Sequence, residues 1–136
     1  MTKERLRNYQ KIKREREQLL HQLEELEAAL YSPKIQQLTG MPSSAPAEGN
    51  PMENLAIHHI ELQERYRAKL DEMAAELLTI EKAIEPLDPV LRVLLRYRYI
   101  YDLKWEDVCV KMNYSWRQTH NLHGKALAML REGSDA

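Results

Sequence analysis

Hydrogen-bonding side chains and an aromatic ring gather in a short stretch near the C-terminal end of the chain. They are Trp116, Arg117, Gln118, His120, Asn121 and Lys125. In a helix, these residues form an exposed face close to the N-terminal end. In proteins that read DNA through a helix-turn-helix, this end of the second helix enters the major groove. The stretch therefore predicts contact with the base edges of a DNA duplex.

Catalysis and metal binding have much weaker support. Cys109, His120 and His123 form the one conceivable nucleophile or metal cluster, and no carboxylate is placed to orient either imidazole. His58 and His59 are adjacent, so they point to different sides of a helix and cannot chelate one ion together. We therefore expect no enzymatic activity, no cofactor and no metal. The single Cys109 is interpreted as a packed thiol.

Two short helices must position the candidate DNA-reading face. Between Leu103 and Arg131, apolar residues recur at helical spacing. They are Val108, Met112, Leu122, Ala126, Leu127 and Leu130. Asn113 suits a left-handed turn, and Ser115 is a favoured N-cap for the following helix. The pattern predicts a helix, a tight turn and a second helix.

A third helix is predicted just before this pair, from Pro89 to about Tyr101. Asp88 is its expected N-cap, with proline at the first helical position. Leu91, Leu94, Leu95 and Tyr99 face inward in this prediction. Its arginines and tyrosines alternate, and they either clamp a nucleic acid backbone or pair with carboxylates and fill core edges. The second, structural interpretation is the commoner one.

The first two thirds of the chain predict two long amphipathic helices, over residues 3–30 and about 52–84. The first carries Ile12, Leu19, Leu23, Leu26 and Leu30, and the second carries Leu55, Leu62, Tyr66, Leu70, Met73, Leu77, Ile80 and Ile84. Neither stripe can be buried alone, so we expect an antiparallel pair. The stretch between them, at about residues 40–52, is rich in Pro, Gly, Ser and Ala and indicates a flexible linker.

The charge is distributed unevenly, although the net charge is only −1. Residues 1–18 carry +4, residues 19–86 carry −7 and residues 87–136 carry +2. Phosphate binding depends on local basic surface, so the total does not exclude DNA. The basic residues Lys11, Lys13, Arg14 and Arg16 form either an arm toward DNA or polymerase or, more commonly, a solvated helix end. No stretch resembles a membrane span or a signal peptide, and a cytoplasmic location is expected.

Four short stretches resemble region 4 of bacterial sigma factors. They are LLRYRY at residues 94–99, LKWEDV at 103–108, MNYS at 112–115 and ALAML at 126–130. The resemblance covers about the last third of the chain. It implies a helix-turn-helix that reads a promoter element and touches RNA polymerase.

The order of elements in the whole chain resembles that of small phage-encoded transcription regulators of the RinA and ArpU type. These combine a long charged helical segment, a linker, a second helix and a C-terminal region 4-like module. The resemblance implies control of phage late or packaging-gene transcription through promoter DNA and host polymerase.

The sigma resemblance also assigns roles to residues. The base-reading end falls on Trp116, Arg117 and Gln118, with His120 and Asn121 one turn later. Arg117 would contact guanine, and Gln118 or Asn121 would contact adenine. Phosphate contacts fall on Lys104, Lys125 and Arg131.

The chain departs from the sigma pattern at two places. Trp-Arg-Gln follows Ser115 where sigma factors usually carry Arg-Glu-Arg, so the resemblance does not imply the usual promoter specificity. Lys104 replaces a small hydroxyl N-cap. Trp105 is expected in the core, whereas Trp116 is expected to be exposed.

The sequence thus predicts an all-α protein, with a long coiled-coil-like hairpin over residues 1–85 and a three-helix module over residues 86–136. We expect a homodimer through the long helices, bound to double-stranded DNA and acting with host RNA polymerase. Two alternatives remain: a phage small terminase subunit, and a polymerase-binding interaction module that does not touch DNA.

Overall fold

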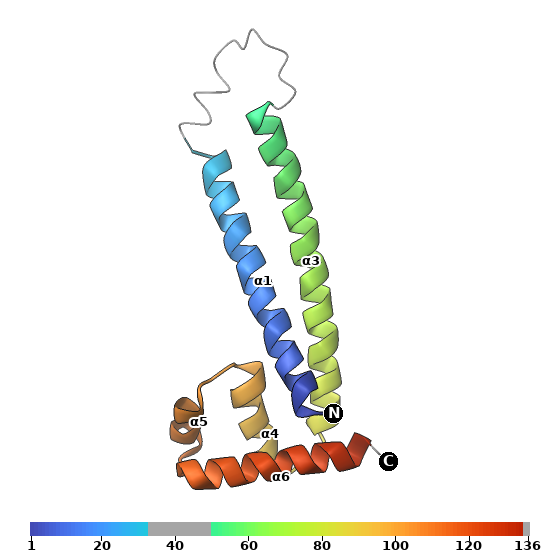
Figure 1. The fold of residues 1–136 in the computed structure, drawn as a ribbon, viewed down its shortest axis with the longest axis vertical. Helices are drawn as coiled ribbons and strands as arrows, with labels where there is room; N and C mark the ends of the chain where they lie inside the picture. The colour runs from blue at the N-terminus through green and yellow to red at the C-terminus, as the bar shows by residue number, and fades with distance from the viewer. Residues whose placement is uncertain (33–49, 135–136) are drawn as a thin grey trace. The chain divides into compact units, whose positions relative to one another are not determined.

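The computed structural model describes residues 1–32 and 50–134, and every regular element in these ranges is helical (Figure 1). The elements are α1 (Lys3–Leu30), α3 (Pro51–Ile84), α4 (Pro89–Leu95), the π-helical segment η1 (Arg96–Ile100), α5 (Trp105–Met112) and α6 (Trp116–Ser134). The predicted all-α class is confirmed for the described residues. Most of the predicted linker at about residues 40–52 lies outside them. No helix in the described part of the chain is long and apolar enough to cross a membrane.

The chain divides into two compact units, and each long helix contributes to both. Unit 1 contains Met1–Lys13 and Glu72–Ala136, and unit 2 contains Arg14–Asp71. The predicted domain boundary between residues 85 and 86 remains a prediction. The contacts group residues 1–13 and 72–85 with the C-terminal helices.

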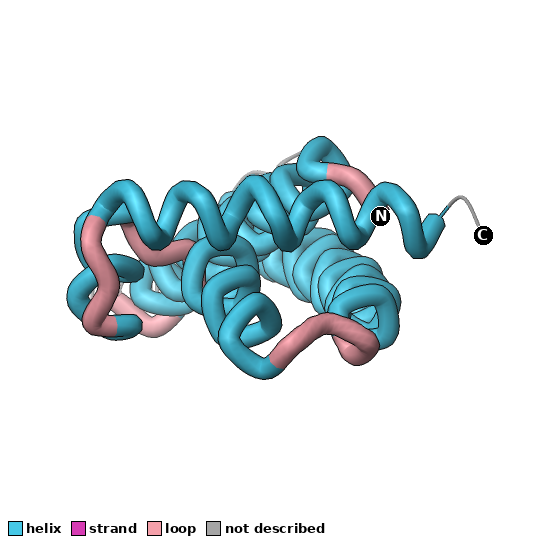
Figure 2. Tube along the Cα trace, turned by 90° about the horizontal axis from the view of Figure 1, so that it is seen from below, coloured by secondary structure: helices cyan, strands magenta, loops and turns pink. Residues whose placement is uncertain are grey.

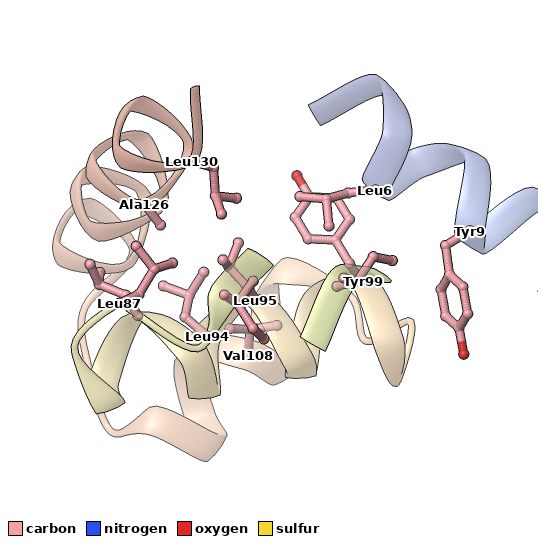
Figure 3. Close-up of a cluster of buried hydrophobic side chains, with 12 residues drawn as sticks. Leu6, Tyr9, Leu87, Leu94, Leu95, Tyr99, Val108, Ala126 and Leu130 are labelled. Atoms are coloured by element: carbon pink, nitrogen blue, oxygen red, sulfur yellow. The ribbon is translucent and has the colours of Figure 1, made fainter. Parts of the chain in front are cut away.

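Unit 1 is built around one apolar cluster, to which both long helices and all the C-terminal segments contribute (Figure 3). Its buried residues are Leu6, Tyr9, Ile80, Ile84, Leu87, Leu91, Leu94, Leu95, Tyr99, Val108, Ala126 and Leu130. The predicted inward residues of α4 to α6 are buried or partly buried here. Leu6 and Tyr9 were not among the predicted core residues, although Leu6 is fully buried.

The third helix has the predicted extent, but it changes character at Arg96. Pro89 begins α4, and Asp88 occupies the N-cap position without a side-chain capping hydrogen bond. From Arg96 the helix widens into η1, and the chain then turns at Asp102, which adopts a positive φ of 57°. Short loops join the helices that follow Ile84 (Figure 2).

Side chains from α1 stabilise the widened segment. Gln10 Nε2 donates to the carbonyl oxygen of Arg98 at 2.9 Å and to Asp102 Oδ1 at 3.0 Å. Lys13 Nζ donates to the carbonyl oxygen of Ile100 at 2.8 Å. These contacts satisfy acceptors that a helix end leaves without intrahelical partners. Lys13, one of the four residues of the predicted basic arm, is therefore engaged inside unit 1.

Of the arginines of α4 and η1, Arg96 pairs with a carboxylate, as the structural interpretation predicts, and Arg92 and Arg98 bind backbone carbonyl oxygens instead. Arg96 pairs with Glu81 through two hydrogen bonds of 3.1 and 2.7 Å. Arg92 donates to the carbonyl oxygen of Glu85, and Arg98 donates to that of Leu103. Each of these guanidinium groups therefore has a partner within unit 1.

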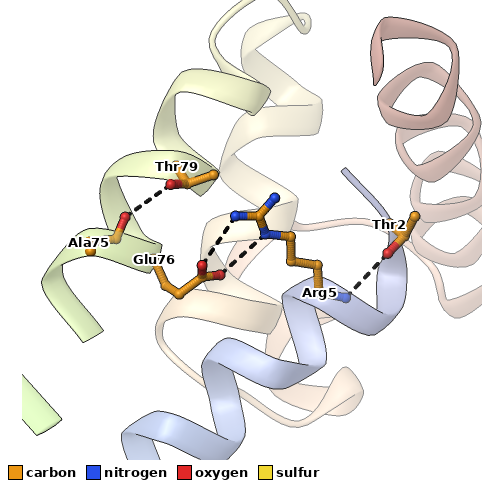
Figure 4. Close-up of polar contacts among 5 residues, drawn as sticks. All are labelled: Thr2, Arg5, Ala75, Glu76 and Thr79. Carbon is orange, nitrogen blue, oxygen red and sulfur yellow. Dashed lines mark hydrogen bonds and ion pairs between the residues drawn. The ribbon is translucent and has the colours of Figure 1, made fainter. Parts of the chain in front are cut away.

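Polar contacts also join the two long helices. In unit 1, Arg5 donates to both carboxylate oxygens of Glu76, at 3.4 and 3.2 Å, and Thr2 Oγ1 accepts from the Arg5 backbone N–H (Figure 4). In unit 2, Lys69 pairs with Glu15 at 2.8 Å and His59 with Glu27 at 3.0 Å. The buried apolar side chains of unit 2 include Leu23 and Leu62.

Candidate nucleic-acid interface

The turn between α5 and α6 depends on the backbone of one residue. Asn113 adopts the predicted left-handed conformation, with φ 58° and ψ 42°. Asparagine enters this region at lower cost than most residues with a Cβ atom. The N–H groups of Asn113 and Tyr114 then donate to the carbonyl oxygens of Val110 and Cys109, each at 3.2 Å. The end of α5 is therefore closed by hydrogen bonds as the chain reverses.

The start of α6 is a reciprocal capping box. Ser115 Oγ accepts the backbone N–H of Gln118 at 3.2 Å, as its predicted N-cap role requires. In return, Gln118 Oε1 accepts the backbone N–H of Ser115 at 3.0 Å. The sequence signal was present, because a serine followed three residues later by glutamine is a capping-box signature. Thr119, fully buried, anchors this turn by donating to the carbonyl oxygen of Ser115 at 2.9 Å.

The capping box makes Gln118 less suited to the predicted adenine contact. Bidentate pairing with adenine requires both the amide oxygen and the amide NH₂ group of glutamine. The oxygen accepts the Ser115 backbone N–H, and this bond holds the amide group against the start of the helix. Asn121, which is exposed one turn later, retains the better position for the predicted adenine contact.

Three of the predicted readers and phosphate contacts share one side of α6. Arg117, Asn121 and Lys125 follow each other at intervals of four residues, and all three are exposed. Side chains four residues apart are neighbours on a helix surface. Lys104, at the N-cap position of α5, and Arg131, in the last turn of α6, are exposed as well.

A hollow of about 460 Å³ adjoins this side of α6. It is lined by Asp88, Val90, Leu91, Tyr114, Gln118, Asn121, Leu122 and Lys125. Residues from the start of α4 and from the α5–α6 turn therefore flank Gln118, Asn121 and Lys125, which remain exposed.

His120 differs from the other predicted readers. Its ring centroid lies 4.4 Å from that of Trp105 and 4.4 Å from that of Trp116. Its Nε2 atom is buried and has no hydrogen-bond partner in the structure. In this arrangement His120 packs between side chains and does not offer that nitrogen to a base.

The two tryptophans take the places expected from the sequence. Trp105 is partly buried against the core cluster, with the Arg98 guanidinium carbon 4.7 Å from its ring centroid. Trp116 leaves 56 % of its surface exposed at the first position of α6. The exposed indole therefore lies at the helix end that was predicted to meet bases.

His123 is part of the buried structure of unit 1. Tyr99 Oη and His123 Nε2 are hydrogen-bonded at 2.7 Å, and both side chains are buried. Burial lowers the pKa of His123 from its ordinary 6.5 to about 4, with nearby positive charge in support. Burial likewise raises the pKa of the Tyr99 hydroxyl. Tyr99 is thus protonated and His123 neutral near pH 7, so the hydrogen bond joins two uncharged groups.

The considered cluster of Cys109, His120 and His123 does not form a metal centre. Among the described residues, no group of three or more His, Cys, Asp or Glu side chains could hold a metal ion. Cys109 is partly buried, in line with a packed thiol.

Comparison with known proteins provides no further assignment: no protein-family model matches the sequence, and no curated protein and no solved structure gives a significant match.

Proposed function

We propose that the protein binds duplex DNA through a helix-turn-helix formed by α5 and α6, with the N-terminal half of α6 in the major groove. One observation carries the proposal. A left-handed Asn113 and a capping box at Ser115 connect α5 to a helix whose Arg117, Asn121 and Lys125 face solvent together. An exposed guanidinium, amide and ammonium group on one helix face match base edges and phosphates.

The proposed roles follow from exposure and chemistry. Arg117 contacts guanine and Asn121 contacts adenine, while Lys104, Lys125 and Arg131 hold phosphates. Gln118 caps the helix and retains the two donors of its NH₂ group for DNA. Trp116 lies beside these readers.

We further propose that the long helices α1 and α3 form a hairpin that pairs two copies of the chain. A single helix-turn-helix buries little surface on DNA, so a second half-site supplies affinity. A paired helix-turn-helix, together with the stretches that resemble sigma region 4, supports the proposal that the protein is a phage or prophage transcription regulator acting with host RNA polymerase.

The proposal is tested by selecting duplexes from a random DNA library and measuring affinity by fluorescence anisotropy at fixed salt. Arg117→Ala should weaken binding to the selected site by about 1–3 kcal/mol and relax the preference at one base pair. Lys125→Ala should weaken binding to all sequences alike and reduce the salt dependence of affinity. Arg67→Ala, an exposed arginine of unit 2, is the matched control and should leave the preference unchanged.

Two results would contradict the proposal in different ways. If no sequence is enriched and Arg117→Ala has no effect, α6 does not read DNA. Crosslinking to polymerase without DNA binding would then favour the interaction-module alternative. Rings of roughly eight or more chains in light scattering, in place of dimers, would favour the terminase alternative.

A further inference from the structure

Three aromatic rings form a continuous row from the core of unit 1 to the exposed start of α6. The row contains Trp105, His120 and Trp116, with 4.4 Å between the ring centroids at each step. At its inner end Trp105 also contacts His123, whose ring centroid is 4.6 Å away. Trp116, which has the largest side chain on the candidate interface, is thus connected through His120 to the packed part of the unit.

The row explains how an exposed tryptophan is held in one orientation. Trp116 and His120 are four residues apart on α6, so their side chains meet on one helix face. His120 in turn reaches Trp105 on α5. This packing restricts the rotation of the indole before any ligand arrives, and preorganised groups lose less entropy on binding.

His120 keeps this place although its Nε2 atom is buried without a partner. An unsatisfied buried nitrogen is unfavourable for stability. The ring therefore contributes through its shape and its contacts with the two indoles.

The chemistry of indole limits what Trp116 can recognise. Indole has one N–H donor and no acceptor, and most of its surface is apolar. The 5-methyl group of thymine is the one apolar group that base pairs present in the major groove. We propose that Trp116 recognises a thymine methyl group, with His120 as the residue that positions its indole. This inference rests on the proposed DNA binding by α6.

The test replaces each thymine of the selected duplex, one at a time, by deoxyuridine, which lacks only the methyl group. Loss of one buried methyl should weaken binding of the unmodified protein about fourfold at one or two adjacent positions. In Trp116→Ala, thymine and deoxyuridine should bind equally well at those positions. Arg117→Ala should weaken binding to both duplexes but preserve their ratio.

The role of His120 is tested by two substitutions. His120→Ala should move the thymine-to-deoxyuridine affinity ratio toward one, while a further Arg117→Ala substitution should still cause its usual loss. His120→Phe retains a ring without the unpartnered nitrogen and should restore the ratio. Val110→Ala removes a side chain that is 79 % exposed on α5, and it should leave the ratio unchanged.

Several outcomes would overturn the inference, and they are distinguishable from failure of the proposed function. If a preferred duplex exists and Arg117→Ala weakens its binding, DNA reading stands. The inference then fails if no deoxyuridine substitution matters, if the site contains no thymine, or if Trp116→Ala preserves the ratio. An unchanged ratio in His120→Ala overturns the positioning role. If no duplex is preferred at all, both proposals fail.

Discussion

The Tyr99–His123 pair makes the stability of unit 1 dependent on pH at the level of one residue. His123 has a pKa near 4 in the folded chain, against 6.5 ordinarily. The unfolded chain therefore binds a proton as the pH falls through 6.5, whereas the folded chain binds it only near pH 4. Neutral His123 contributes fully to the free energy of unfolding above pH 6.5. This contribution is lost progressively as the pH falls from 6.5 to 4, by up to about 3 kcal/mol.

This prediction is checked by urea unfolding at pH 7.5 and pH 5, followed by tryptophan fluorescence. Both tryptophans of the chain belong to unit 1, so the signal reports on that unit. His123→Gln can still accept from the Tyr99 hydroxyl but does not titrate, and it should lose less stability than the unmodified protein between the two pH values. Equal losses in the two proteins would show that other groups cause the pH dependence.

Residue roles were predictable where local sequence decides them. Asn113 and Ser115 have their predicted roles because turn conformation and N-capping depend on neighbours within a few residues. The packing of His120 was not predictable, because it depends on Trp105, fifteen positions away on another helix. A polar ring at helical spacing looks the same in the sequence whether it faces solvent or an indole.

At the level of elements, the capping box should stabilise the start of α6. Ser115→Ala removes the acceptor for the Gln118 backbone N–H, and we expect a loss of about 1 kcal/mol in the free energy of unfolding. Thr79→Ala is the matched control, since its hydroxyl donates to Ala75 within α3, where alanine is a good helix former (Figure 4). It should cause little or no loss in the same fluorescence-monitored unfolding. A comparable loss in both variants would show that the hydroxyl at Ser115 has no special role.

Helix existence was predictable from apolar spacing, but the change from α4 to η1 was not. The sequence around Arg96 contains no proline or glycine that would mark a distortion. The widened segment is supported by Gln10 and Lys13, which lie more than 80 positions earlier in the chain. Such long-range hydrogen bonds leave no periodic signal in the segment that they stabilise.

At the level of the whole molecule, the compact units do not follow the order of the chain. Residues 1–13 pack with the C-terminal helices, and Leu6 and Tyr9 enter their apolar cluster. The first half of α1 looked weakly apolar and solvated because only these two residues and Ile12 are apolar among many charges. A helix segment with few apolar residues can still be packed stably when other helices supply the rest of the core. We therefore expect residues 86–136 alone to be much less stable than the same helices in the full chain.

The contribution of α1 is tested in the full chain by comparing two buried leucines, Leu6 in unit 1 and Leu62 in unit 2. Leu6→Ala should lower the free energy of unfolding reported by tryptophan fluorescence by about 2–5 kcal/mol, because it leaves a cavity in the cluster around Tyr99 and Leu130. Leu62→Ala deletes the same group from unit 2, and it should act mainly on the helical circular dichroism signal. If Leu6→Ala leaves the tryptophan transition in place while Leu62→Ala shifts it, the start of α1 is not part of the core that supports α6. With the predicted result, any partner that alters the N-terminal end of α1 also alters the core that supports α6.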